Sequence, residues 1–367
     1  MTAKLTKILI KTAVFLALLS LCTGLLMPKY VESLEEGSFI AEYYREEVPH
    51  DVLFAGDCEA YGNFSPAAIW QRSGISSFVR GSAQQLIPQT YWLAAEMLEK
   101  ETPKLLVVNV LAMTEPGQTN EAYNRMTVDG MRLSKYKIGA ALASMTEEES
   151  LSSYLIPLLR FHSRWSELSS EDFRYLFGKP LVSHSGYLLE TGVKPAENVP
   201  KGRPLGDYSF SGKNLEYLGR IADLCEEKGV RLLLVKAPTV YPYWYPQWDE
   251  NVKSFAAERG VDYINLLELS DEIGLDMMTD TYDAGLHLNV SGAEKLSFWF
   301  ADMLKERYGL EGHAGDPAYE AAWAEKLGRY EAAKAAGYAA QGAAEAAPAV
   351  KGAAEAAPAE QPAGGKI

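Results

Sequence analysis

Between residues 51 and 310, short and almost wholly apolar runs alternate with longer segments whose apolar residues recur at helical spacing. Runs rich in Val, Leu and Ile are typical of strands buried on both faces of a sheet. We expect five such strands, at residues 51–56, 76–80, 104–110, 231–236 and 262–266. Strands that alternate with helices predict a parallel sheet in a three-layer, flavodoxin-like α/β fold.

Helix boundaries are marked by capping residues. Ser65 followed by Pro66 is an N-cap with proline at the first helical position, and it predicts a short helix that ends near Gly74. In the helix that ends at Gly229, an apolar face includes Cys225, which we interpret as a buried hydrophobic residue. The other helices are expected at residues 88–101, 248–260 and 291–310.

The alternation is interrupted between the third and fourth strands. Residues 115–204 are too many for a connecting loop, so we expect a helical insertion packed over or beside the carboxyl ends of the strands. The main domain therefore spans residues 51–310 and includes this insertion.

The amino terminus has the pattern of a membrane segment. Lys4, Lys7 and Lys11 precede an uncharged apolar run at residues 12–27, and basic residues favour the cytoplasmic side. We expect residues 1–30 to be an uncleaved single-pass anchor, with the domain outside the cell membrane. The alternative is a cleaved signal peptide, for which Ser20-Leu21-Cys22 offers a poor site.

The segments that flank the domain are polar or of low complexity. Residues 31–50 are acidic and are interpreted as a stalk. Residues 311–330 are expected to form a C-terminal helix. Residues 331–367 are dominated by Ala, Glu, Pro and Gly, so we expect a flexible tail with helical stretches at most.

Composition narrows the class of protein. The 367 residues are 47% hydrophobic, which is enough for one large core, and the net charge of −14 argues against a nucleic-acid partner. The three cysteines lack zinc-ligand spacing and are too few for a disulfide framework. The sequence has no Gly-rich phosphate loop or metal-ligand cluster, so no cofactor and no metal site are expected.

Polar residues follow three of the predicted strands, at the edge of the sheet where α/β proteins bind ligands. Gly56-Asp57-Cys58 follows the first strand, and the glycine would allow a sharp turn that exposes Cys58. Gly81 follows the second strand, and Asn109 ends the third. Before the last helix, Asp283 and His287 lie in one loop.

These positions resemble the SGNH/GDSL hydrolase family. Gly56-Asp57-Cys58 is similar to its Gly-Asp-Ser block, Gly81 and Asn109 to its second and third blocks, and Asp283 with His287 to its closing Asp-x-x-His. The resemblance implies acyl-ester chemistry. Cys58 would attack, His287 would be the base and Asp283 would orient it. Backbone N–H groups, with Gly81 and Asn109, would hold the oxyanion, and Asp57 would fix the turn.

The sequence departs from this family in three places. Cys58 replaces the serine, and a thiolate is a competent nucleophile at neutral pH. Asp283 precedes His287 by four residues and not three, so Asp280 is a second candidate for the orienting carboxylate. Asn109 lacks the glycine usually found two residues earlier, and it could instead satisfy backbone groups at a strand end. Glu59 beside Cys58 would raise the pKa of the thiol.

Two further segments contain residues of the kind that bind sugars or phosphates. In the insertion these are Arg125, His162 and Arg164, and after the fourth strand they are Tyr243 and Trp244. The alternative for the first group is that it holds the insertion onto the domain. For the aromatic pair the alternative is a packed lid.

An anchor followed by an outward-facing domain is also similar to the D-alanyl transfer protein of teichoic-acid modification and to alginate O-acetylation proteins. This resemblance implies a membrane-bound O-acyltransferase partner and a cell-envelope polysaccharide or teichoic-acid-like substrate. We expect an acyl-ester hydrolase or O-acyltransferase. The alternatives are a catalytically degenerate scaffold of such a system, whose Cys58 would be unreactive, and a secreted esterase or lipase that needs no partner.

Overall fold

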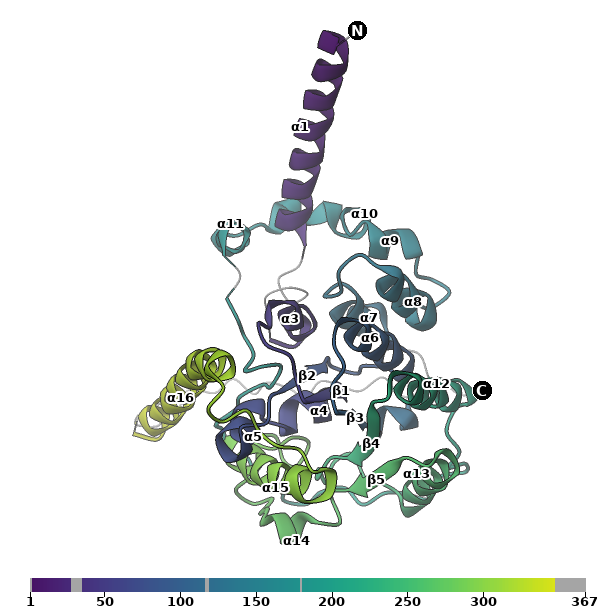
Figure 1. Cartoon of the computed structure of the whole chain (residues 1–367), viewed down its shortest axis with the longest axis vertical. Coiled ribbons are helices and arrows are strands. Elements are labelled where there is room, and N and C mark those ends of the chain that lie inside the picture. The colour runs from purple at the N-terminus through teal and green to yellow at the C-terminus, as the bar shows by residue number, and fades with distance from the viewer. Residues whose placement is uncertain (1, 28–34, 116–118, 179, 347–367) are drawn as a thin grey trace, which may run out of the picture.

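The centre of the molecule is one parallel sheet of five strands in the order β2-β1-β3-β4-β5, with helices on both faces (Figure 1). The computed structural model describes residues 2–27, 35–115, 119–178 and 180–346. The strands are β1 (Val52–Gly56), β2 (Ser77–Gly81), β3 (Leu105–Asn109), β4 (Arg231–Lys236) and β5 (Asp262–Asn265). Each bound lies within one residue of the predicted one. The strand order is that of the flavodoxin-like class, so the predicted fold class is confirmed.

Alternate side chains of the strands enter two separate apolar cores, one on each face of the sheet. Val52 and Phe54 of β1 belong to the first core and Leu53 and Ala55 to the second. The first core is covered by α4 (Cys58–Asn63), α5 (Pro66–Ser73), α14 (Ser270–Ile273) and α15 (Val290–Tyr308). The second is covered by α6 (Ile87–Lys100), α12 (Gly212–Lys228) and α13 (Pro246–Arg259). Burial on both faces explains the continuous apolar runs of the strands.

The helix-capping residues identified in the sequence cap the corresponding helices in the structure. The Ser65 hydroxyl accepts a hydrogen bond from the N–H of Ala68 at the start of α5, and Gly74 ends that helix with a φ of 69°. Asn289 caps α15 in the same way, through the N–H of Gly292. Side-chain caps of this kind satisfy N–H groups that the first helical turn leaves unpaired.

The segment between β3 and α12 folds largely as helices. These are η2 (Leu111–Thr114), α7 (Glu121–Val128), α8 (Lys135–Ser144), α9 (Leu151–Leu155), α10 (Leu158–Phe161), η3 (His162–Glu167) and α11 (Ser170–Phe177). Val128, Ala140 and Tyr154 form a small core of their own with Leu93 of α6. The described residues from 119 to 178 contain no strand.

The predicted stalk is wrong in its described part, because residues 39–45 pack against the domain. They belong to α3 (Glu35–Glu42) and η1 (Tyr43–Arg45). Phe39, Ile40 and Tyr43 are fully buried in three different cores, and the Tyr43 hydroxyl donates to Glu101 over 2.6 Å. The acidic composition hid these apolar residues, whose burial stabilises the segment on the sheet.

The first part of the predicted tail is helical, because helix α16 (Pro317–Ala346) continues well past residue 330. Ala and Glu have high helix propensity, and tertiary contacts add to it. Trp323 stacks on Trp70 of α5 with ring centroids 5.0 Å apart. Farther along, Lys334 contacts Glu294 of α15. Residues 347–367 lie outside the described part of the chain.

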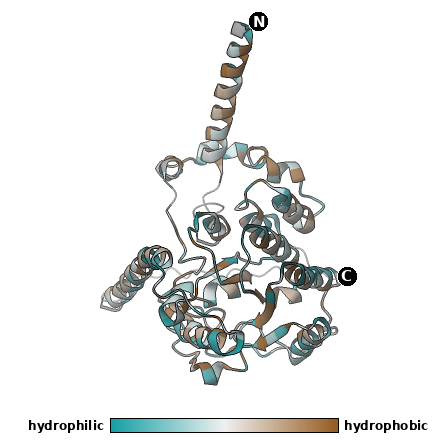
Figure 2. Cartoon of the chain, viewed as in Figure 1, coloured by the Kyte–Doolittle hydropathy of each residue, from teal (hydrophilic) through white to brown (hydrophobic). Residues whose placement is uncertain are grey.

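Helix α1 (Thr2–Leu26) extends away from the domain and shows mostly hydrophobic and neutral residues (Figures 1 and 2). Its segment Lys4–Leu26 has a mean hydropathy of 2.1 and is not buried against the rest of the chain. It is therefore long and apolar enough to cross a membrane. An anchor and a signal sequence share these properties.

Candidate active site

Two glycines bring the carboxyl ends of β1, β2 and β3 close together. Gly56 has a φ of 153°, and a Cβ there would lie 2.9 Å from Cβ of Asn109. Gly81 pairs with Gly56 across β1 and β2, and a Cβ on Gly81 would lie 2.7 Å from the Gly56 carbonyl oxygen. A side chain at either position would separate the strands, so glycine is needed for this close approach. Asp57 and Cys58 follow directly, at the start of α4.

Asn109 joins three strand ends through its side-chain amide. Its Nδ2 donates to Oδ1 of Asp57 and to Oε2 of Glu59, each over 3.0 Å, and its Oδ1 accepts from the N–H of Ala237. Both amide hydrogens are therefore engaged. The sequence-based assignment of Asn109 as an oxyanion donor has no support in this geometry, and the alternative, a structural amide at the strand end, describes its contacts.

The carboxylate of Glu59 forms an ion pair with a buried lysine. Lys236, the last residue of β4, donates to Oε1 of Glu59 over 2.7 Å, and both side chains are almost completely buried. Thr239 contacts the same carboxylate oxygen and accepts from Lys236. Glu59 therefore points into this cluster, where Lys236 balances its charge. Lys236 was not among the predicted site residues, although a lysine at the end of an apolar strand is a signal that the sequence contains.

The same buried cluster changes the titration of Asp57. Burial, together with the nearby Glu59 carboxylate, raises the pKa of Asp57 to about 7, although the hydrogen bonds from the Glu59 N–H and from Asn109 act in the opposite direction. Asp57 also caps α4 through that N–H over 3.1 Å. Its role in the structure is thus to fix the turn that holds Cys58.

We expect this carboxyl group to make stability fall with rising pH. The folded protein keeps a proton on Asp57 up to about pH 7, whereas the unfolded chain loses it near pH 4. Because the folded state binds more protons in that interval, its free energy of unfolding decreases from about pH 4 to about pH 7. Denaturant titrations at several pH values should show a flatter profile for Asp57→Asn. Parallel profiles for the two proteins would contradict the assignment.

Asp283 is the carboxylate that orients His287. Its Oδ2 lies 2.6 Å from Nδ1 of His287, and its Oδ1 accepts the backbone N–H of the same residue over 2.7 Å. Asp280 instead binds Lys295 and Ser291, so it does not orient His287. The extra residue between Asp283 and His287 is accommodated by left-handed backbone at Ala284 and Gly285, with φ values of 67° and 96°.

The His287 ring lies against helix α4. A Cβ on Gly62 would be 3.0 Å from Cδ2 of His287, and Leu288 donates its N–H to Oδ1 of Asn63. Residues four apart share one face of a helix, so His287 contacts the face that begins with Cys58. Gly62 and Asn63 were not identified from the sequence, because their role depends on a loop more than 200 residues away.

The second ring nitrogen of His287, Nε2, is left free to accept a hydrogen bond. This atom is buried and has no hydrogen-bond partner within the described part of the chain, so Cys58 makes no direct hydrogen bond to it. Cys58 is half-buried and is not in a disulfide. A proton path through one water molecule stays a prediction. Tyr282, also missed from the sequence, stacks on the ring with a centroid distance of 5.8 Å.

Most of the proposed substrate-binding residues are engaged elsewhere. Arg125 is buried and binds Glu121, Asp129 and Ser153 of the insertion, which supports the structural alternative. Arg164 donates to the carbonyl of Leu26 at the end of α1, and His162 is exposed in η3. In the aromatic segment, Trp244 is buried with its Nε1 on Asp249, whereas Tyr243 is 41% exposed.

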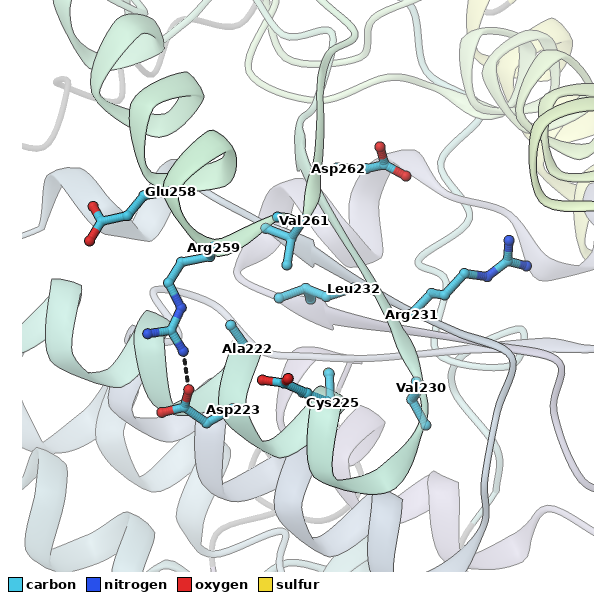
Figure 3. Close-up of a pocket in the computed structure, with 12 residues that line it drawn as sticks. Ala222, Asp223, Cys225, Val230, Arg231, Leu232, Glu258, Arg259, Val261 and Asp262 are labelled. Atoms are coloured by element: carbon cyan, nitrogen blue, oxygen red, sulfur yellow. Dashed lines mark hydrogen bonds and ion pairs between the residues drawn. The ribbon is translucent and has the colours of Figure 1, made fainter.

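A cleft of about 690 Å³ lies at the opposite edge of the sheet, at the amino ends of β4 and β5 (Figure 3). Acidic and basic side chains line it, among them Asp223 and Arg259, which form an ion pair. Cys225 also lines it, but burial raises the pKa of its thiol to about 12. Cys225 is therefore protonated at neutral pH, and no histidine lines this cleft among the described residues, in contrast to the Asp283–His287 pair beside α4. The described residues contain no cluster of His, Cys, Asp or Glu side chains that could hold a metal ion.

The sequence matches no family model and no curated protein. Solved structures similar to the chain include a protein named for the lipolytic G-D-S-L family from Desulfitobacterium hafniense DCB-2, with 12% identity and a TM-score of 0.35 over 69% of this chain and 99% of that one. A family 3 carbohydrate esterase from Clostridium thermocellum has 12% identity and a TM-score of 0.34 over 72% and 99% of the two chains. With similarity this low, the fold is defined by the sheet order, and functional inference rests on the geometry around α4.

Proposed function

We propose that the chain catalyses acyl-ester hydrolysis or O-acyl transfer through Cys58, His287 and Asp283. The observation that supports this most directly is the state of the His287 ring. One nitrogen is held by Asp283 at 2.6 Å. The other is buried next to the helix face of Cys58 and has no partner among the described residues. An acceptor held in this way has the geometry of a general base that waits for a proton.

The Asp283 contact determines which tautomer of His287 is favoured. A carboxylate that accepts a hydrogen bond from Nδ1 keeps the proton on that nitrogen and leaves the lone pair on Nε2. Asp283 would also stabilise the imidazolium that forms when Nε2 takes a proton. Asp283 is the positioning residue of this site.

The chemistry would proceed in two acyl transfers. The Cys58 thiol gives its proton to Nε2 of His287 through one water molecule, and the sulfur attacks the carbonyl carbon of the ester. The tetrahedral adduct collapses with loss of the alcohol, which takes the proton from Nε2, and a thioester remains on Cys58. Water or an acceptor hydroxyl then attacks the thioester, and His287 removes and returns the proton in the same order. Backbone N–H groups near Gly81 would stabilise the oxyanion.

The substrate we propose is an acyl ester of a cell-envelope glycan or a teichoic-acid-like polymer. An apolar α1 that spans the cell membrane would hold the domain on the outer side, where such polymers lie, because Lys4, Lys7 and Lys11 favour the cytoplasm for the amino terminus. A membrane-bound O-acyltransferase is the proposed partner and the proposed source of the acyl group.

A scaffold function is the second candidate, and the contacts of Asn109 favour it. Both of its amide hydrogens are bonded to carboxylates of the buried cluster, so an oxyanion donor expected from the family resemblance is missing in this state. A protein that keeps the fold but binds without catalysis would have an unreactive Cys58.

Thiol alkylation distinguishes the two candidates. In a Cys22→Ser background, iodoacetamide should modify Cys58 faster than a model thiol at neutral pH, because His287 accepts its proton. Replacement of His287 with alanine should slow the reaction, whereas Cys225 should stay unmodified in the folded protein because burial keeps it protonated. If Cys58 reacts at the rate of a model thiol with or without His287, the catalytic proposal fails and the scaffold remains.

A further inference from the structure

Helices α9, α10, η3 and α11 lie in a row at the base of α1 (Figure 1). Three contacts fix α1 to this row. Arg164 of η3 donates to the carbonyl oxygen of Leu26 over 2.8 Å, and Met27 packs with Phe161 of α10. At Gly24 a Cβ would lie 3.1 Å from a methyl carbon of Leu176 in α11.

The same row exposes large apolar side chains. Trp165 is 72% exposed, Ile156 50%, Leu159 55% and Phe173 48%. Each of these residues lies on a segment that contacts the base of α1, or on a segment next to one that makes such a contact. We refer to these four residues as the apolar base surface. Aromatic and aliphatic side chains exposed together mark a surface that another apolar phase covers.

The length of α1 places this surface at the depth of a bilayer boundary. Residues 12–26, which are uncharged, rise about 22 Å as a helix, whereas the hydrocarbon core of a bilayer is about 30 Å thick. Even with Lys11 extended toward the headgroups, little of α1 is left over at its carboxyl end. The residues that contact Gly24, Leu26 and Met27 must then lie at the boundary, with no spacer to lift them into water.

We propose that the apolar base surface inserts into the interfacial layer of the membrane that α1 spans. Trp165 lies at headgroup level, as tryptophan does at membrane boundaries, while Ile156, Leu159 and Phe173 enter the upper acyl region. The occupant is a lipid surface, because the exposed side chains that define it are apolar and two cations beside them already have partners. Arg160 binds Glu121, and Arg164 binds Leu26 and Asp172. Insertion fixes the orientation of the domain relative to the membrane.

Fluorescence quenching by brominated lipid tests this contact. The full-length chain is reconstituted into phosphatidylcholine vesicles with and without bromine near the headgroup end of the acyl chains. The wild-type protein should lose part of its tryptophan emission in the brominated vesicles. The variant Trp165→Phe should lose most of that quenching. The matched control Trp299→Phe removes a half-buried tryptophan of α15, and it should leave the absolute loss of emission in brominated vesicles unchanged.

Four outcomes would overturn the inference. Trp165→Phe could be quenched as strongly as the wild type, or bromine could have no effect on either protein. A chain that does not stay with the vesicles would refute the α1 anchor together with the inference. If Trp165 became shielded from acrylamide only after a membrane protein was added, the surface would bind protein and not lipid. Cys58→Ala should be quenched like the wild type, so a failure of the catalytic proposal would leave this inference intact.

Discussion

Alanine in place of Cys58 is expected to abolish formation of a covalent acyl-enzyme. The thioester forms on the sulfur of Cys58, and alanine offers no atom to carry the acyl group. An activated acetyl ester and intact-protein mass spectrometry would show a single acetyl adduct on the wild type and none on Cys58→Ala. Cys58→Ser should keep part of the activity. His287→Gln should lower the rate by about 10²- to 10⁴-fold, the usual contribution of a general base.

The controls for this experiment lie in the same chain. Cys225→Ala and Cys22→Ser remove the other two thiols and should leave acylation at the wild-type rate. Gly62→Ala tests position alone, because its Cβ would press on the His287 ring at 3.0 Å while every proposed catalytic residue remains. Normal acylation of the envelope polymer in cells that carry Cys58→Ala would place the chemistry in the partner.

The sheet could be predicted closely because its strands are buried on both faces. Leu53 and Phe54 enter different cores, so both must be apolar and the whole strand stands out in the sequence. The ends of the flanking helices could be predicted from local capping residues such as Ser65 and Gly74. Such signals lie within a few residues of each other and need no knowledge of the rest of the fold.

The two flanking segments were predicted less well than the sheet. Their average composition is polar or of low complexity, but their structure depends on contacts made by a few large apolar residues. Three buried residues, Phe39, Ile40 and Tyr43, hold an acidic segment on the domain. At the other end, Trp323 and Tyr330 fix an alanine-rich helix. In both cases a few large apolar side chains outweigh the average polarity of the segment.

Within the candidate site, contacts between residues close in the sequence could be predicted, whereas contacts between distant residues could not. Asp283 and His287 lie in one loop, so their pairing could be expected from the sequence, although the choice between Asp280 and Asp283 needed the structure. The contact between Glu59 and Lys236 joins residues 177 positions apart. A single sequence contains no signal that links such a pair. The hydrogen bond from Asn109 to Glu59 was not predicted for the same reason.

Replacing Lys236 with methionine is expected to destabilise the protein strongly. Methionine fills a similar volume but leaves the Glu59 carboxylate buried without its cation, and breaking a buried ion pair in this way typically costs about 3–5 kcal/mol. Thermal unfolding followed by circular dichroism should show a clear drop in Tm. The double variant Lys236→Met with Glu59→Gln should recover much of the loss, because it removes the uncompensated charge.

The exposed pair Arg72–Asp302 provides the matched comparison. Its two side chains are 54% and 42% exposed, and solvent screens such a pair, so Arg72→Met should change Tm little. The opposite result for Lys236, an unfolding curve like that of the wild type, would contradict a stabilising role for the buried Glu59–Lys236 ion pair.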